Sequence, residues 1–152
     1  MYQSKHPDIV KKAREIVGEM KDSARVAQAI CLWVFTNLDK RGIAAYSNSL
    51  ETLKSMKGDC SEHAALFVGL CRAVGLPARV ANGIAYANSI GGFGGHAWAE
   101  VYVGKWISVD PTFGEPIAGP LRIKLAGEGF LQNVRMMKLI GEMKIEFVPD
   151  EQ

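Results

Sequence analysis

The chain has 152 residues, of which 48% are apolar and 22% are charged, and its formal net charge is +2. These values are typical of one globular domain with a substantial core, so we expect residues 1–152 to form a single domain, either as a whole protein or as part of a longer chain. The weak charge, without a Lys/Arg run, argues against nucleic-acid binding. The sequence shows no apolar run of membrane-spanning length and no signal-peptide core, so a cytoplasmic protein is the default expectation.

The first half of the chain has the hydrophobic period of helices. Apolar residues recur at three- and four-residue intervals over residues 8–20 and 23–38, and a short helix is predicted over residues 49–56. A fourth, strongly apolar helix is predicted over residues 60–74, ended by Gly-Leu-Pro. Because this fourth helix is apolar on most of its surface, we expect it to be buried.

Cys60 stands at the start of the fourth predicted helix. Asp59 is the expected N-cap and Glu62 lies at the N3 position, which is the pattern of a capping box. The first turn of a helix has unpaired backbone N–H groups and the positive end of the helix dipole. Both features stabilise a thiolate, which is the reactive form of cysteine.

The second half of the chain alternates as strands do. A strand is predicted over residues 79–86, with a possible bulge at Gly83, and a glycine-rich loop over residues 89–95. This loop is either a plain surface loop or a mobile flap over a site. Residues 96–103 and 106–110 read as an antiparallel hairpin.

The last predicted elements are a strand over residues 121–125, a helix over residues 130–140 and a strand over residues 144–148. Helices therefore precede a mainly antiparallel sheet. This order predicts an α+β fold in which the Cys60 helix packs on one face of the sheet.

Cysteines and histidines are few and are not spaced as metal ligands. The cysteines are Cys31, Cys60 and Cys71, and the histidines are His6, His63 and His96. An odd number of cysteines without a CxxC pair argues against a disulfide framework and against a zinc site. The sequence therefore predicts neither a metal nor a cofactor, and Cys31 is expected in the core as a small apolar side chain.

Three residues have the chemistry of a thiol acyl-transfer site. Cys60 is the candidate nucleophile, His96 begins a predicted strand, and Asp110 ends the next one. In such a site the thiolate attacks a carbonyl carbon, the imidazole moves the proton, and the carboxylate orients the imidazole. We therefore predict a Cys60, His96 and Asp110 triad.

Four blocks of the sequence resemble the core of the transglutaminase-like superfamily. They are GDCSEHA at 58–64, LCRAVGLPARV at 70–80, GHAWAEVYV at 95–103 and WISVDPT at 106–112. The blocks follow the order of the family and cover roughly residues 49–112. The resemblance implies a papain-like arrangement, with the cysteine on a helix and the histidine and aspartate on adjacent strands. It also implies that Cys60 is the nucleophile, His96 the base and acid, and Asp110 the orienting residue.

This triad sets a condition on the hairpin. A two-residue loop would pair Val103 with Trp106 and would turn Asp110 away from His96. A three-residue loop pairs Tyr102 with Trp106 instead and brings Asp110 to the face of His96. We therefore predict the longer loop, or a bulge.

Other residues near the candidate site have weaker assignments. His63 lies one helical turn past Cys60, and we expect a structural or partly exposed role for it because a base on the same turn leaves little room for substrate. The backbone N–H of Cys60 is the expected oxyanion donor. A second donor is expected from upstream, and the candidates are Trp33, Tyr46 and Asn48.

The predicted function is thiol-dependent acyl transfer or hydrolysis at peptide or side-chain amides, through a thioester acyl-enzyme. The expected partner is a peptide or protein substrate. Transglutaminase-like domains include peptidases, amidases, deamidases, cross-linking enzymes and inactive members. Two alternatives therefore stay open: a cross-linking transglutaminase and a catalytically silent peptide-binding module.

Overall fold

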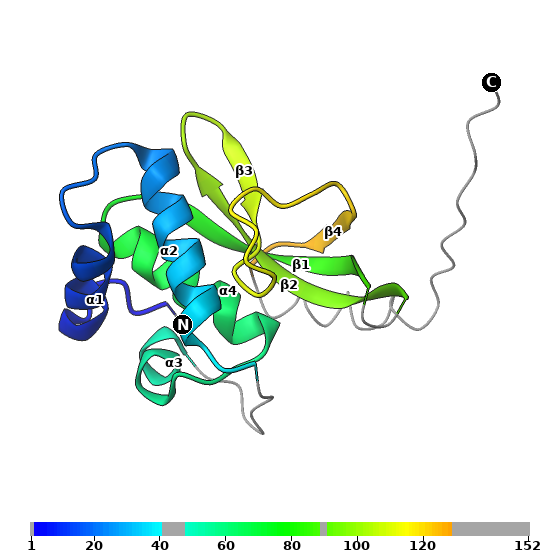
Figure 1. The fold of residues 1–152 in the computed structure, drawn as a ribbon, viewed down its shortest axis with the longest axis horizontal. Coiled ribbons are helices and arrows are strands. Elements are labelled where there is room, and N and C mark those ends of the chain that lie inside the picture. Colours follow the sequence, from blue (N-terminus) through cyan, green and yellow to red (C-terminus); the bar gives the residue numbers. More distant parts are fainter. Residues whose placement is uncertain (1, 41–47, 89–90, 129–152) are drawn as a thin grey trace.

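The computed structural model describes residues 2–40, 48–88 and 91–128. Its helices are α1 (Pro7–Val17), α2 (Ser23–Asn37), α3 (Ser49–Ser55) and α4 (Cys60–Ala73). Its strands are β1 (Ala78–Ala87), β2 (Gly92–Tyr102), β3 (Trp106–Val109) and β4 (Arg122–Ala126). The helices lie to one side of the strands (Figure 1), so the predicted α+β class is confirmed.

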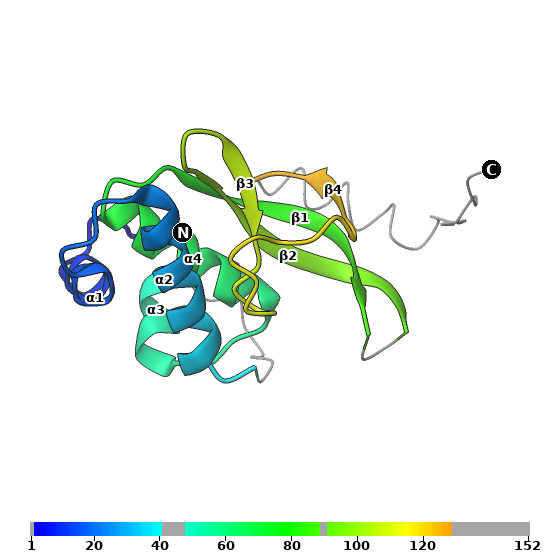
Figure 2. The ribbon, with the colours of Figure 1, turned by 45° about the horizontal axis from the view of Figure 1, so that its top comes forward.

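Helix α4 is the central element of the fold. It contacts the other three helices and also strands β1 and β2, and Figure 2 shows the remaining helices gathered around it, away from the sheet. Every residue from Glu62 to Cys71 is buried. A helix that is apolar all round is stable only inside a fold, because it has no face suited to water. The burial of α4 leaves Cys60, in its first turn, half-buried.

The four strands form one antiparallel sheet in the order β3-β2-β1-β4. Along β2, the residues at 97, 99 and 101 pack with the helices in the core. Because strand side chains alternate, His96, Trp98 and Glu100 belong to the other face of the sheet. We call this second face the outer face.

The hairpin of β2 and β3 has the predicted three-residue loop. Tyr102 pairs with Trp106, and Ala99 pairs with Val109. Asp110 follows β3 directly and therefore falls on the outer face, beside His96. The register that the candidate triad requires is confirmed.

Strand β4 approaches β1 closely at Gly83. The pairing of the two strands shifts its register between Asn82 and Gly83, and a Cβ atom on Gly83 would lie 2.0 Å from the carbonyl oxygen of Ile123. Only glycine fits at such a contact. The predicted irregularity at Gly83 is thus confirmed, and it lies where β4 pairs with β1 at the edge of the sheet.

The predicted glycine-rich loop over residues 89–95 is wrong from Gly92 onward. Strand β2 begins at Gly92, which pairs with Ala87 of β1. Two aromatic rings stabilise this end of the hairpin, because Tyr86 and Phe93 pair across it edge to face, with their centroids 5.5 Å apart. Cross-strand packing of this kind overrides the turn preference of glycine. The surface-loop and flap interpretations are therefore replaced by a long hairpin.

The predicted helix over residues 130–140 and the predicted strand over residues 144–148 lie outside the described residues. The other predicted helices are present, with ends that differ from the predictions by a few residues. The predicted strand over residues 121–125 is present as β4.

Candidate active site

Cys60 is the first residue of α4, at a helix start that its neighbours define closely. The Asp59 side chain accepts a hydrogen bond from the N–H of Ser61, and the Glu62 side chain accepts one from the N–H of Asp59 at 3.1 Å. The predicted capping box is therefore present. Gly58 makes room for it, because a Cβ there would lie 2.3 Å from the Cβ of Glu62. These contacts hold the free thiol of Cys60 next to the N-terminal amides of the helix.

His96 connects the other two predicted site residues. Its Nε2 lies 2.8 Å from Oδ2 of Asp110, and the two side chains are 8% and 0% exposed. The side chain of Cys60 also lies near enough to His96 to contribute to the raised pKa of the imidazole. Because Nε2 is occupied by Asp110, Nδ1 is the ring nitrogen that remains for the thiol. The structure therefore brings Cys60, His96 and Asp110 together, with His96 hydrogen-bonded to Asp110 and close to the thiol.

Asp110 is a buried carboxylate with both oxygens engaged. Oδ1 accepts hydrogen bonds from the N–H groups of Thr112 and Phe113, at 3.0 and 3.1 Å. Oδ2 accepts from Nε and Nη2 of Arg122, at 3.0 and 2.7 Å, in addition to His96. A buried charge is tolerated only when it is paired and hydrogen-bonded in this way.

Arg122 is a member of the site that the sequence analysis missed. It comes from β4, its side chain is 7% exposed, and it also pairs with Glu115 at 2.8 Å. An arginine at the start of a predicted strand carries no local sign that it will reach a carboxylate. The path of β4 beside β1 places it, and that pairing cannot be read from a local pattern.

Aromatic rings cover the imidazole of His96. The ring of Phe113 stacks on it with centroids 4.6 Å apart and an interplanar angle of 7°. The ring of Trp98, which is almost fully buried, lies 6.4 Å away at 17°. These rings restrict the orientation of the imidazole and shield its bond to Asp110 from water.

The pKa values of the pair favour a charged imidazolium and a charged carboxylate. Burial alone would lower the pKa of His96, but the hydrogen bonds and charges of Asp110 and Cys60 outweigh it and raise this pKa to about 9. Burial alone would raise the pKa of Asp110, but His96 and Arg122 outweigh it and lower that pKa. His96 is therefore protonated at neutral pH, and an imidazolium beside a thiol stabilises the thiolate.

The other histidine on α4 has a different environment. His63 is fully buried, which excludes the partly exposed role but agrees with a structural one. Its Nδ1 lies 2.7 Å from the carbonyl oxygen of Asp59, so Nδ1 carries the proton and donates. Burial lowers the pKa of His63. The ring is thus neutral and bonded to its own helix.

The remaining cysteines are enclosed in the core. Cys31 and Cys71 are fully buried, and burial is the main cause that raises the pKa of Cys31 to about 12 and the pKa of Cys71 above its ordinary value. The core position predicted for Cys31 is confirmed. Of the three cysteines, Cys60 alone is partly exposed.

Two of the three upstream candidates for a second oxyanion donor have other contacts. The Asn48 side chain caps α3 by accepting hydrogen bonds from Leu50 and Glu51. The ring of Trp33 lies 5.6 Å from Nζ of Lys12, on α1. Tyr46 lies outside the described residues. The second donor therefore stays a prediction without an assigned residue.

Across residues 2–40, 48–88 and 91–128, no group of three or more His, Cys, Asp or Glu side chains is arranged to hold a metal ion. Within the same part of the chain, every helix is too short or too polar to cross a membrane.

Comparison with solved structures shows similar folds in bacterial proteins. A candidate cysteine protease from Cytophaga hutchinsonii is 28% identical, with a TM-score of 0.71 over 83% of this chain and 43% of that one. The periplasmic domain of TgpA from Pseudomonas aeruginosa is 26% identical, with a TM-score of 0.54 over 71% of this chain and 44% of that one. LapG from Legionella pneumophila, at 13% identity and a TM-score of 0.59, shares the fold alone, over 84% of this chain and 77% of that one.

The chain spans less than half the length of the first two structures. No curated protein sequence matches it. The family model of the transglutaminase-like superfamily matches residues 10–111, which is most of the chain. The fold and its neighbours support a thiol-dependent enzyme or a related module of the same fold. The chain belongs to the transglutaminase-like superfamily.

Proposed function

We propose that this protein hydrolyses or transfers acyl groups at peptide or side-chain amides, with Cys60 as the nucleophile, His96 as the acid and base, and Asp110 as the orienting residue. The observation that carries the proposal is that His96 is hydrogen-bonded to the buried Asp110 and also lies close to the Cys60 side chain. Its thiol stands at a helix N-terminus, and its imidazole is held in place by a buried carboxylate. Each group thus has the partner that its role requires.

In the acylation step, the Cys60 thiolate attacks the carbonyl carbon of the amide. The developing oxyanion lies near the backbone N–H of Cys60, which the helix start leaves unpaired. The imidazolium of His96 then donates its proton to the amine nitrogen as the C–N bond breaks. The products of this step are a free amine and a thioester on Cys60.

In the deacylation step, the neutral imidazole accepts a proton from the acyl acceptor. With water as the acceptor, a C–O bond forms, the thioester C–S bond breaks, and a carboxylic acid and a regenerated thiolate–imidazolium pair result. With an amine as the acceptor, the same step forms a new amide, which is a cross-linking reaction. Water is the proposed acceptor, because no feature of the described residues is built as an amine site.

The first experiment measures the alkylation of Cys60 by iodoacetamide as a function of pH. A thiolate stabilised by His96 reacts well below the pH at which a free cysteine ionises, about 8.5. We expect Cys60 of the wild-type chain to be alkylated rapidly even at about pH 6. In the His96→Ala variant, alkylation at this pH should be slow. Mass spectrometry assigns the modified residue, and the burial of Cys31 and Cys71 makes them poor competitors.

An alkylation profile of the wild-type chain that follows an ordinary thiol would contradict the proposal and favour a silent peptide-binding module. A second experiment identifies the substrate by trapping the acyl-enzyme from a library of peptides and reading the added mass. Repeating it with an added primary amine separates hydrolysis from cross-linking, because only cross-linking yields a new amide product.

A further inference from the structure

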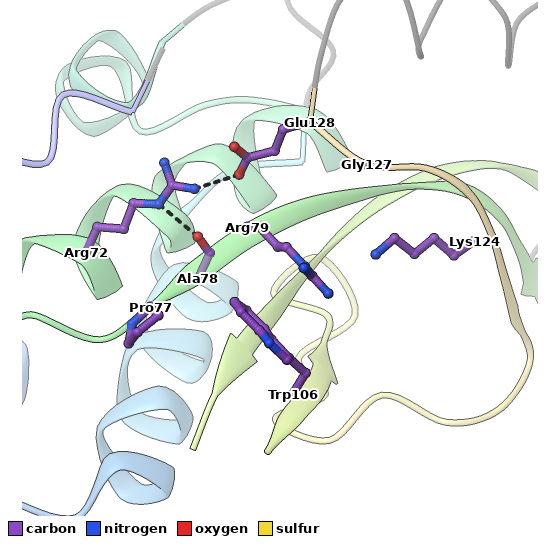
Figure 3. A pocket seen from close by; sticks show the side chains of 8 residues that line it. All are labelled: Arg72, Pro77, Ala78, Arg79, Trp106, Lys124, Gly127 and Glu128. Atoms are coloured by element: carbon purple, nitrogen blue, oxygen red, sulfur yellow. Dashed lines mark hydrogen bonds and ion pairs between the residues drawn. The ribbon is translucent and has the colours of Figure 1, made fainter. Parts of the chain in front are cut away.

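A second feature of the outer face lies well away from Cys60. It is a hollow of about 510 Å³, which we call the basic hollow (Figure 3). Its walls include Arg79 of β1, which pairs with Glu100 of β2. In the candidate active site, His96 of β2 pairs with a different residue of β1, Gly83. Arg79 and Gly83 are four positions apart, which corresponds to roughly 13 Å along the strand. The basic hollow is therefore separate from the candidate active site.

Three cations and an exposed aromatic ring line the basic hollow. The cations are Arg72, Arg79 and Lys124. Figure 3 shows Arg79 against the ring of Trp106, with the end of Lys124 directed toward the same space. The Arg79 guanidinium lies 4.1 Å from the centroid of the Trp106 ring, and Trp106 is 43% exposed. Cationic and aromatic surface thus face the same volume.

Two carboxylates hold these cations in place. Oε2 of Glu100 accepts hydrogen bonds from Nε of Arg79 and from Nζ of Lys124. Oε1 of Glu128 accepts hydrogen bonds from Nη2 of Arg72 and from the N–H of Val80. The side chains of Arg79 and Lys124 are 43% and 36% exposed, so N–H groups of both cations remain open to solvent beside Glu100. Cations that are positioned beforehand lose less conformational entropy when a ligand binds.

The balance of charge defines the ligand. Three cations against two carboxylates leave a surplus of one positive charge, which suits a single carboxylate. A phosphate dianion would bring a second negative charge close to Glu100 and Glu128. The volume of the hollow is larger than one carboxylate needs. Tyr102, 42% exposed and packed edge to face on Trp106, extends the aromatic surface for the apolar part of a larger ligand.

We propose that the basic hollow binds a glutamate or aspartate side chain of an acidic peptide segment, with the adjoining peptide lying against Trp106 and Tyr102. The carboxylate contacts the outward N–H groups of Arg79 and Lys124, while the aromatic rings cover apolar atoms of the peptide. The proposal does not depend on the chemistry at Cys60. It adds a binding site to the protein whichever reaction the thiol performs.

The test follows the indole N–H signal of Trp106 by NMR during titration of the full chain at low salt. The probes are a blocked tetraglutamate peptide, a blocked tetraglutamine peptide and inorganic phosphate. We expect the tetraglutamate peptide to shift the signal saturably and the tetraglutamine peptide to leave it unchanged. Lys124→Met should weaken binding roughly five-fold, the loss expected for one partly exposed charge contact.

The control variant is Lys54→Met, which removes one exposed positive charge on α3, outside the basic hollow, and should leave binding unchanged. Glu128→Gln removes one negative charge from the wall and should strengthen binding. A tetraglutamine peptide that shifts Trp106 equally would overturn the acidic specificity. Phosphate that binds as well as tetraglutamate would overturn the peptide assignment, and no saturable shift with any probe would overturn the site itself.

Discussion

Two carboxylates associated with the outer face each hold two cationic side chains, but in opposite surroundings. The buried cluster is Asp110 with His96 and Arg122, and the open cluster is Glu100 with Arg79 and Lys124. In the buried cluster all three side chains are at most 8% exposed. In the open cluster the carboxylate is 14% exposed, and its cations are 43% and 36% exposed.

The difference shows that burial, and not the pairing of charges, decides what such a cluster does. In low dielectric surroundings each charge contact is strong, and an unpaired charge is costly. The buried cluster therefore holds one imidazole in one protonation state beside the Cys60 thiol. Water and salt screen the open cluster, and its partly exposed cations remain accessible to a further carboxylate.

The largest expected effect comes from Asp110→Asn. This change keeps the shape of the side chain but removes the charge that holds the imidazolium. We expect kcat/KM to fall on the order of 10³–10⁴-fold, measured on an amide identified by acyl-enzyme trapping. The matched control is Glu100→Gln in the open cluster, which should leave kcat/KM within about two-fold. Equal losses in the two variants would mean that burial does not separate the clusters.

Arg122→Met should have the next largest effect. Without Arg122 the carboxylate of Asp110 is free to move, and we expect kcat/KM to fall by about 10²-fold, as for other small misplacements of catalytic groups. Breaking this buried ion pair should also lower the free energy of unfolding by about 3–5 kcal/mol, whereas Lys124→Met should lower it by no more than about 1 kcal/mol.

A pH profile distinguishes positioning by Arg122 from a purely structural role. Arg122 shares Oδ2 of Asp110 with His96, so its removal strengthens the hold of Asp110 on the imidazolium and raises the pKa of His96. In Arg122→Met, the fall in rate on the alkaline side should therefore occur at a higher pH than in the wild-type chain. Arg122→Lys should restore part of the activity. If Arg122→Met lowers the stability but leaves the pH of the alkaline fall in rate unchanged, the role of Arg122 is structural only.

For the wild-type chain, the raised pKa of His96 predicts loss of activity at high pH. Because this pKa is about 9, kcat/KM should fall roughly ten-fold for each pH unit above about 9. The protonated His96 stabilises the fold fully below its unfolded pKa of about 6.5, and this contribution is lost as the pH rises through about 9.

The contribution of Asp110 to stability changes with pH in the opposite direction. Its pKa is lowered in the folded state, so its contribution to stability is present above about pH 3.9 and is lost as the pH falls through the folded value. Urea unfolding at a series of pH values measures both contributions. A stability that does not change between about pH 6.5 and 9 would contradict the assignment of His96.

The smallest expected effect concerns salt. Glu100→Gln should lower the free energy of unfolding by less than about 1 kcal/mol, and this loss should shrink in about 1 M salt, where the screening length is about 3 Å. The loss in Asp110→Asn should persist in salt because its partners are buried. Urea unfolding at low and high salt measures the loss of unfolding free energy in both variants. A loss in Asp110→Asn that shrinks in salt would contradict the distinction between a buried and an open cluster.

Sequence patterns predicted the parts of this molecule that depend on local structure. The capping residues Asp59 and Glu62 located the start of α4, and period-two alternation predicted which loop would bring Asp110 beside His96. These features follow from residues within a few positions of one another, or from one hairpin. Local propensity and side-chain periodicity are sufficient to predict them.

The parts that were missed depend on contacts between distant strands. Arg122 reaches Asp110 because β4 crosses to pair with β1, about 40 residues earlier in the chain. Gly92 and Phe93 were interpreted as a loop because glycine favours turns, whereas the pairing of Phe93 with Tyr86 extends the hairpin. Tertiary packing decided both cases, and no window of neighbouring residues contains that information.

The turn that follows β3 has a consequence for the proposed reaction. Asp110 and Phe113 belong to one short segment, in which Oδ1 of Asp110 accepts the N–H of Phe113 while the Phe113 ring stacks on His96. One segment therefore sets both the direction of the imidazole proton and the tilt of the ring. The entropy of ordering the ring is lost once, when the chain folds, and not again each time a substrate arrives. In the proposed reaction, the imidazolium is already aligned when the amide reaches Cys60.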